Sequence, residues 1–334
     1  MSETTNIAWT DSTAGPWLIC TEVSPGCGHC YAREMMMTRL KTIARNSFKA
    51  AGFKDWETRP VWGDTAPRIL TRDFRGKMLA MNRKPFICDG CGEGHQFAAV
   101  SCPVYPGQPA KVHCPNCDQP HTVHRRRSFP SLIDWLDDMP AGIIDQDGNK
   151  LDPIAVLADF LDTLRQCDQM VRILCTKRPE NFFTKLQRAL EFVFHREGAT
   201  DLFLWIEGWK TGENIPKNII LLTSVENQEQ DWRIDELRKI PAACRGSSFE
   251  PLLSPIGFGG DGKLMDGISW AIIGCESGPR RRECKLEWIE SLVEQGKSAG
   301  VAVFVKQVSI NGKVSHDPAE WPEHLRVREW PKGL

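Results

Sequence analysis

The chain has 334 residues, of which 42 are basic and 43 acidic, for a formal net charge of −1. This length suffices for one large α/β domain or for a domain with an insert. The charge balance excludes a global field that would draw the protein onto nucleic acid, although a local basic patch is still allowed. The N-terminal segment lacks the apolar core of a signal peptide, and no run approaches the about 20 apolar residues of a spanning helix. We therefore expect a cytoplasmic protein with no membrane partner.

The first chemical motif is Cys20, Cys27 and Cys30, spaced C-x6-C-x2-C. Three thiolates on one short loop can bind three irons of a [4Fe–4S] cluster and leave the fourth iron open for chemistry. Half of a zinc site, or three ordinary cysteines, would have the same spacing. No fourth cysteine lies nearby, and His29 brings a ring next to Cys30 that could pack on an adenine.

Residues 31–53, directly after this loop, have the composition and period of a helix with a basic outer face. Residues 55–85 carry no pattern that predicts an element. Residues 86–124 change character: they are rich in Cys, His, Gly and Pro and have no helical period.

Two C-x2-C pairs in this segment, Cys88 with Cys91 and Cys114 with Cys117, predict a zinc ribbon. The alternative ligands are Cys102, His95, His113, His121 and His124, none of which has paired spacing. Such a ribbon contacts nucleic acid or a partner, or is a purely structural staple. Arg125–Arg127 follows it as a phosphate-binding patch or, equally, a solvated linker.

From residue 151 onward, helices alternate with short apolar strands, which predicts a parallel sheet, open or closed into a barrel. The expected helices are 151–167, 180–195, 231–240 and 284–300, with a loop after 195. The expected strands are 171–175, 218–226, 246–250, 268–277 and 301–307.

Polar groups follow five of these strands, and active sites of β/α barrels lie at the carboxyl ends of strands. A helix cap or a solvated turn would explain any single one. The groups are Thr176-Lys177-Arg178, Ser224 with Glu226 and Asn227, Ser248 with Glu250, Glu276-Ser277, and Lys306-Gln307. Because the first strand leads into the cysteine loop, we expect Cys20, Cys27 and Cys30 at the barrel mouth.

Six ordered motifs resemble the phage Gp37/Gp68 proteins (DUF5131), which are regarded as radical S-adenosylmethionine (SAM) enzymes. They are C-x6-C-x2-C followed by YA, ILCTKRPENF, LTSVENQEQDWRIDELRKIPA, SSFEPLLSPI, WAIIGCESGPRRRECKLEWIESL and VAVFVKQ. The resemblance covers residues 5–31 and about 125–310, and the zinc insert is an addition to the family pattern. Ser131 and Asp134 match a Ser-x-x-Asp element of the family.

The resemblance implies an α/β fold, a partial (β/α)6-type barrel with an inserted zinc ribbon. Residues 1–85 and 125–334 would form the barrel, and 86–124 the insert. SAM would bind the open iron, and reduction by a protein such as flavodoxin or ferredoxin would yield a 5′-deoxyadenosyl radical.

Roles for individual residues follow from the same resemblance. Glu276 and Ser277 would receive the SAM amino group, in an element where Cys275 replaces a glycine. Ser224, Glu226, Ser248 and Glu250 are candidates for the SAM ribose or carboxylate. Lys177, Arg178, Lys306 and Asp134 are candidates for the substrate, with the three cations suited to a phosphate or a carboxylate.

The favoured function is an isomerase that rearranges an already modified thymine in phage DNA or a nucleotide, in the host cytoplasm. A base in a duplex would have to be flipped out at a cost of roughly a few kcal/mol. Radical repair of a damaged base is the second enzymatic hypothesis. A nucleic-acid-binding protein in which the metals are only structural or sensory is the third.

Overall fold

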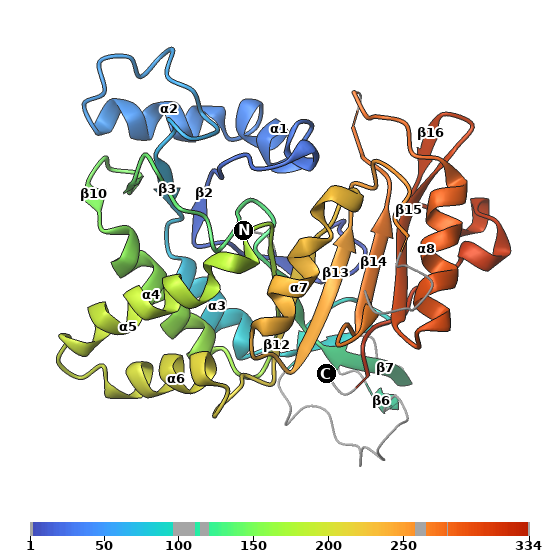
Figure 1. The fold of residues 1–334 in the computed structure, drawn as a ribbon. Helices are drawn as coiled ribbons and strands as arrows, with labels where there is room; N and C mark the ends of the chain where they lie inside the picture. The colour runs from blue at the N-terminus through green and yellow to red at the C-terminus, as the bar shows by residue number, and fades with distance from the viewer. Residues whose placement is uncertain (1–2, 96–110, 114–119, 258–264, 279, 333–334) are drawn as a thin grey trace.

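Figure 1 shows the computed structural model, which describes residues 3–95, 111–113, 120–257, 265–278 and 280–332. Its centre is an eight-stranded sheet, curled into a half-barrel, in the order β1-β8-β11-β12-β13-β14-β15-β16. The first seven strands of that order are parallel and follow one another in chain order, whereas β16 is antiparallel to β15. The expected α/β class with a parallel sheet is therefore confirmed.

Five strands of this sheet, β11 to β15, match the expected ones within a few residues, whereas β1, β8 and β16 had no predicted bounds. The strands of the sheet are β1 (Ser12–Thr13), β8 (Arg127–Phe129), β11 (Val171–Thr176), β12 (Ile219–Ser224), β13 (Cys244–Phe249), β14 (Trp270–Gly274), β15 (Ala302–Ile310) and β16 (Lys313–Ser315).

Successive residues of these strands serve two separate cores, because side chains alternate between the faces of a sheet. Leu174 and Leu221 join the helices in the larger core. Ile173 and Leu222 instead pack with Trp270 inside the curl of the sheet. Burial of both faces explains why the strands read as continuous apolar runs.

The helices after β8 fill the connections between strands. They are α4 (Pro153–Gln166), α5 (Phe182–Phe194), α6 (Thr200–Thr211), α7 (Trp232–Lys239) and α8 (Leu286–Ser298). Pro153 begins α4, and the Asp152 carboxylate caps it by accepting from the backbone N–H of Ile154 at 2.9 Å. The expectation of a loop after residue 195 is wrong, because α6 lies there. Its apolar residues surround the helix, with Ile206 buried but Leu204 57% exposed, so it lacks the clean stripe that predicts a helix.

The N-terminal part forms a cap with its own four-stranded sheet, β10-β9-β3-β2. Its elements are β2 (Trp17–Leu18), β3 (Arg68–Leu70), β9 (Ile143–Ile144), β10 (Lys150–Leu151), α1 (Tyr31–Met37) and α2 (Lys41–Ala50). The helix α3 (Phe74–Asn82) instead packs against α4 in the larger core. The helix expected over 31–53 is two helices, since Thr38, at φ −115° and ψ −86°, leaves the helical region. The cysteine loop follows β2 rather than the first barrel strand.

The insert contains a small antiparallel sheet in the order β5-β4-β7-β6. Its strands are β4 (Phe86–Cys88), β5 (Gly94–His95), β6 (Lys111–His113) and β7 (Pro120–Arg125). Cys88 is buried and Cys91 is exposed. Cys102, Cys114 and Cys117 lie outside the described residues, so the zinc site stays a prediction. β7 runs almost directly into the barrel strand β8.

The arginines between β7 and β8 are structural. Arg125 and Arg126 donate to backbone carbonyls of other segments, and Arg126 is only 4% exposed. The guanidinium of Arg127 lies over the ring of Trp330 at 4.4 Å. The prediction of a phosphate-binding patch at Arg125–Arg127 is therefore wrong. These side chains instead contact backbone carbonyls and an aromatic ring of the protein, and so join the insert to the barrel.

A buried ion network joins the cap to the barrel. Arg68 of β3 and Asp137 are both 0% exposed and approach to 2.5 Å. Asp137 also lies 3.5 Å from Arg178, which follows β11 and pairs with Asp134 at 3.0 Å.

Among the described residues, no helix is long and apolar enough to cross a membrane.

Asp137→Asn should lower the free energy of unfolding by about 3 kcal/mol or more, because it leaves two buried arginines short of one negative charge. Chemical denaturation at neutral pH measures this. Asp147→Asn is the matched control: its pair with Arg72 is 71% and 67% exposed and should contribute less than about 1 kcal/mol. Equal losses in the two variants would contradict a special role for the buried network.

Candidate functional site

A cavity of ≈ 850 Å³ lies between the cap and the carboxyl ends of the parallel strands. In Figure 1 the arrowheads of β13, β14 and β15 point towards the level of α1. The volume is within the range of ligand sites, about 300–1,000 Å³. Thirteen of the predicted site residues line it: Cys20, Cys27, His29, Cys30, Asp134, Lys177, Arg178, Ser224, Ser248, Glu250, Glu276, Ser277 and Lys306.

The inner face of the sheet becomes polar where this cavity begins. Trp270 and Phe304 fill the lower part of the curl together with Trp9, whose ring centroid lies 6.2 Å from that of Trp270. Farther along the strands, the inward positions carry the small side chains Ser224 and Ser248, which line the cavity. The aromatic residues thus support a floor of small polar groups.

The cysteine loop is bound to two strand ends. Gly26 N–H donates to Glu226 Oε1 at 3.1 Å. A Cβ at Gly26 would lie 3.0 Å from Glu226 Cδ, so only glycine fits this approach without a shift. On the other side, His29 Nδ1 lies 3.1 Å from Glu276 Oε2, and Arg282 joins Glu276 to a carbonyl of the loop.

Glu226 is an anchor of the loop and does not line the cavity. It is 0% exposed and pairs with Arg233 at 3.0 Å. Burial favours the neutral acid, but the charges of Lys177 and Arg233 and the bond from Gly26 outweigh it and lower the pKa of Glu226. The expected contact between Glu226 and SAM has no support, because its oxygens serve the protein.

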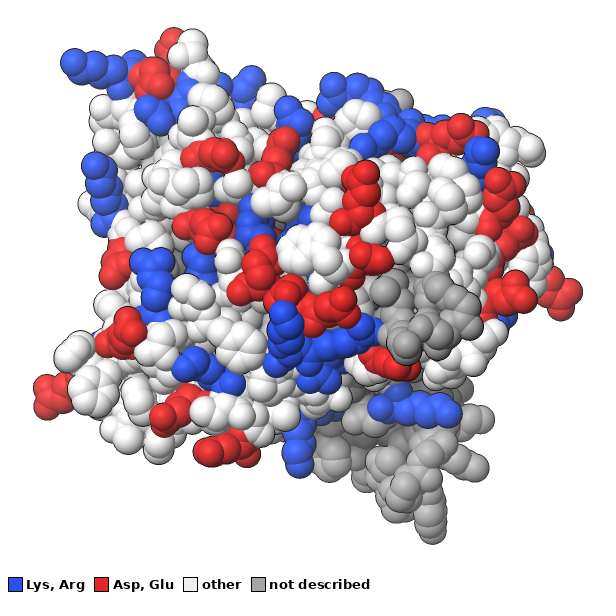
Figure 2. All heavy atoms as spheres, in the orientation of Figure 1, with Lys and Arg blue, Asp and Glu red and all other residues white. Residues whose placement is uncertain are grey.

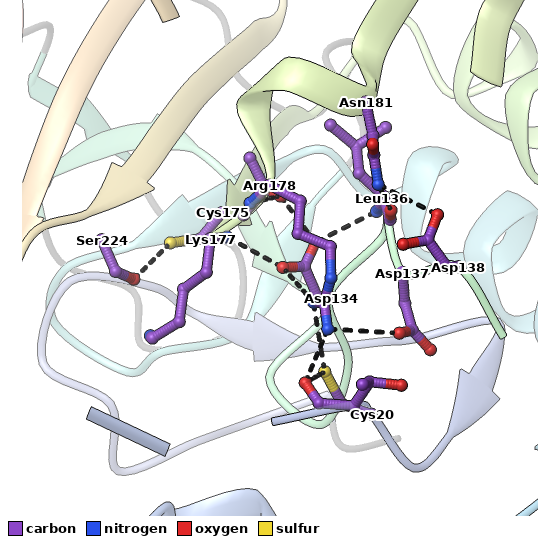
Figure 3. A network of polar contacts seen from close by, with 12 residues as sticks. Cys20, Asp134, Leu136, Asp137, Asp138, Cys175, Lys177, Arg178, Asn181 and Ser224 are labelled. Atoms are coloured by element: carbon purple, nitrogen blue, oxygen red, sulfur yellow. Dashed lines mark hydrogen bonds and ion pairs between the residues drawn. The ribbon is translucent and has the colours of Figure 1, made fainter. Parts of the chain in front are cut away.

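Figure 3 shows a second anchor, built on Asp134 and Arg178. Asp134 accepts hydrogen bonds from Thr176 Oγ1 at 2.6 Å, from the Lys177 N–H at 2.8 Å and from Arg178 Nη1 at 3.0 Å. Arg178 also donates to the carbonyl of Thr21 at 2.7 Å, and its Nη1 lies 3.9 Å from Cys20 Sγ. These contacts support the cysteine loop. Both side chains also line the cavity, and their expected role at the substrate stays a prediction.

Glu276 is a third group whose expected role changes. Burial alone would raise its pKa, but the hydrogen bonds and charge of Arg282, together with His29, lower it. This carboxylate therefore fixes the loop after β14 against the cysteine loop. The neighbouring Ser277 is exposed at the edge of the cavity.

The chemistry and arrangement of the three thiols bear on the expected iron–sulfur cluster. Burial is the largest cause that raises the pKa values of Cys20 and Cys30, so both carry protons that metal binding would displace. Among the described residues, no three His, Cys, Asp or Glu side chains converge on a point that would hold a metal ion. Three thiols are a donor set that suits a thiolate-bound cluster, but in this structure they do not converge on one point, so the cluster stays a prediction.

The far wall of the cavity combines predicted strand-end groups with two residues that no motif revealed. Lys306 pairs with Glu250, and Gln307 donates to the carbonyl of Cys275 at 2.6 Å. Gln307 Oε1 is buried without a hydrogen-bond partner in the described part of the chain. His316 and Arg328 complete this wall. Both lie beyond the last strand that the sequence predicted, where no periodicity marked them.

A family model described as "Protein of unknown function (DUF5131)" matches residues 4–78 and 147–329. The chain belongs to the DUF5131 family. No curated protein and no solved structure matches the chain. The matched ranges of DUF5131 include the three cysteines and all five polar strand ends. They omit residues 79–146, which contain the insert and also Asp134, so the expectation that the family pattern resumes near 125 is wrong.

Glu226→Gln should destabilise this DUF5131 protein by about 3 kcal/mol at pH 7, because Arg233 stays buried without its carboxylate. Since the pKa of Glu226 is lowered from 4.5, its contribution is complete above that value and is lost as pH falls through the folded-state pKa. Urea denaturation at pH 7 and near pH 3 measures both states.

Glu229→Gln is the matched control, since Glu229 is exposed and lies three residues farther along the chain. It should leave stability within about 0.5 kcal/mol of the original at either pH. If Glu226→Gln lowers the free energy of unfolding equally at pH 7 and pH 3, the assignment of a buried, ionised carboxylate to Glu226 is contradicted.

Proposed function

We propose that this DUF5131 chain is a radical SAM enzyme that holds a [4Fe–4S] cluster on Cys20, Cys27 and Cys30 and rearranges a nucleotide or a nucleic-acid base. One observation carries the proposal: the three cysteines and the polar ends of five successive parallel strands line a single cavity. A cluster with one open iron supplies one-electron chemistry at SAM, which gives access to unactivated C–H bonds.

The chain's own contribution is to hold the loop and to control charge. Glu226, Arg178 and Arg282 anchor the cysteine loop from three sides. Burial disfavours the ammonium of Lys177, but the neighbouring Cys27 and Glu226 outweigh it and raise the pKa of Lys177. Lys177 therefore stays charged in the cavity, where it suits a carboxylate or phosphate of a ligand.

The remaining lining groups can orient a nucleoside and exclude water from it. Ser224 and Ser248 line the floor, where the Ser224 hydroxyl lies 3.4 Å from Cys175 Sγ. The unpaired Gln307 Oε1 is an acceptor suited to an N–H of a base or an amine. Glu250 and Lys306 neutralise one another and so keep the wall polar without a large net charge.

The anaerobically reconstituted protein should release 5′-deoxyadenosine when SAM and a reductant are added, with DNA or nucleotides present as acceptors. Liquid chromatography of the products measures it. Cys27→Ala should abolish both the release and the visible absorbance of the cluster. Cys244→Ala, a buried cysteine outside the cavity, is the control and should retain both. Absence of release under all conditions refutes the enzyme proposal, and a restored rather than rearranged base would indicate a repair lyase.

Metal analysis should separate the two cysteine groups, because the proposed zinc ligands lie in the insert. Cys27→Ala should lose iron and retain zinc, whereas Cys88→Ala should lose zinc and retain iron. Elemental analysis of the purified variants measures both metals. Loss of both metals from the Cys27 variant would mean that the cysteines are divided wrongly between the centres.

A further inference from the structure

The entrance to the cavity is bordered by two basic segments. Residues 31–41 contain three basic residues and one acidic residue, and residues 277–285 contain four basic residues and one acidic residue. Figure 2 shows Lys and Arg side chains gathered along the upper edge of the molecule, above β13 and β14 of Figure 1. This local charge contrasts with the overall net charge of −1.

The two segments meet across the entrance. Arg280 Nη2 lies 3.7 Å from Glu34 of α1. Arg282 donates to the carbonyl of Pro25 in the cysteine loop at 2.9 Å. The segments therefore form one continuous rim, which we call the basic rim: residues 31–41 and 277–285, without residue 279.

Some cationic side chains of the basic rim are bound by other groups of the protein, and others face solvent. Arg282 is held by Glu276, and Arg281 donates to two backbone carbonyls. Arg280 is 76% exposed, and among the described residues its ion pair is the long contact with Glu34. Arg39 is exposed and also lines the cavity. Arg39 and Arg280 thus offer positive charge on both sides of the entrance.

An aromatic ring stands at the same entrance. Tyr31, the first residue of α1, is 53% exposed and lines the cavity directly after Cys30. Exposed aromatic rings flanked by cations are the usual platform for unpaired bases, because every base has a π-face and each phosphate attracts a cation.

We propose that the basic rim binds a single-stranded polynucleotide, with an unpaired base stacked on Tyr31 and phosphates held by Arg39 and Arg280. In the proposed function the bound base would then be rearranged, but binding of the strand does not depend on that reaction. A single strand is favoured over a duplex for two reasons. A ring at the cavity entrance can stack only on an unpaired base, and a duplex base must first be flipped out.

An acidic protein, such as an electron donor, would be attracted by the same cations. It would have no particular need for the exposed ring of Tyr31. The contribution of Tyr31 therefore distinguishes the two kinds of partner. Tyr31→Phe should keep strand binding, because stacking needs the ring and not the hydroxyl.

Fluorescence anisotropy of a labelled single-stranded 12-mer with the anaerobically reconstituted full chain tests the proposal. Tyr31→Ala should weaken binding by about 5-fold or more. Arg39→Gln and Arg280→Gln should each reduce the slope of log K against log salt by about 0.7. The controls are Phe194→Ala and Arg188→Gln on α5, both exposed and outside the cavity, which should bind like the unaltered chain.

Three results would overturn the inference: no binding of the strand, equal losses in the control variants, or a Tyr31→Ala variant that binds the strand unchanged while an acidic flavodoxin competes for the rim. Failure of this inference is separable from failure of the proposed function. Release of 5′-deoxyadenosine without strand binding would refute only the proposal that the basic rim binds a strand. Strand binding through Tyr31 without such release would support that proposal and refute the proposed enzyme activity.

Discussion

The buried pairing of Arg68, Asp137, Arg178 and Asp134 is the constraint on which the site depends. It joins the cap, which contains the cysteine loop, to the end of β11 in the barrel. Buried charges are costly to bring out of water, so such a network is tolerated only when each charge has its partners. Here Arg178 also donates to the carbonyl of Thr21 and Arg68 to its hydroxyl, which couples the cap's position to that of the thiols.

The same contacts put positive charge beside the cysteines. Arg178 lies near Cys20, and Lys177 stays charged beside Cys27. A thiolate-bound cluster is anionic, and cations or hydrogen-bond donors near its sulfurs tune its reduction potential. The arrangement around the loop therefore serves two purposes in the proposed enzyme: it fixes the loop on the barrel mouth, and it compensates the charge of the group that the loop is expected to hold.

Much of the barrel half was predictable, because long apolar strands and amphipathic helices leave strong periodic signals. The alternation from α4 to β15 followed from those signals, except for α6, whose apolar residues surround the helix. The strand-end rule also located the cavity. It could not say which strand-end side chains also anchor the cysteine loop: Glu226 serves the protein alone, and Asp134 and Arg178 line the cavity while they hold the loop.

What the sequence missed depends on contacts between distant segments. Trp9 and Arg328 lie near the two ends of the chain and meet the cavity only because the sheet is curled. The run Arg125–Arg127 looked like a patch because a local pattern of charge does not reveal the carbonyls that the guanidinium groups reach. The cations that do face solvent at the entrance, Arg39 and Arg280, belong to segments whose meeting the sequence does not indicate.

Electron paramagnetic resonance of the reduced, anaerobically reconstituted protein tests the central claim most directly. The account predicts the signal of a reduced [4Fe–4S] cluster whose g values shift when SAM is added, because SAM would bind the iron that Cys20, Cys27 and Cys30 leave open. A signal that SAM does not alter, or a protein that takes up only zinc at these cysteines, would contradict it.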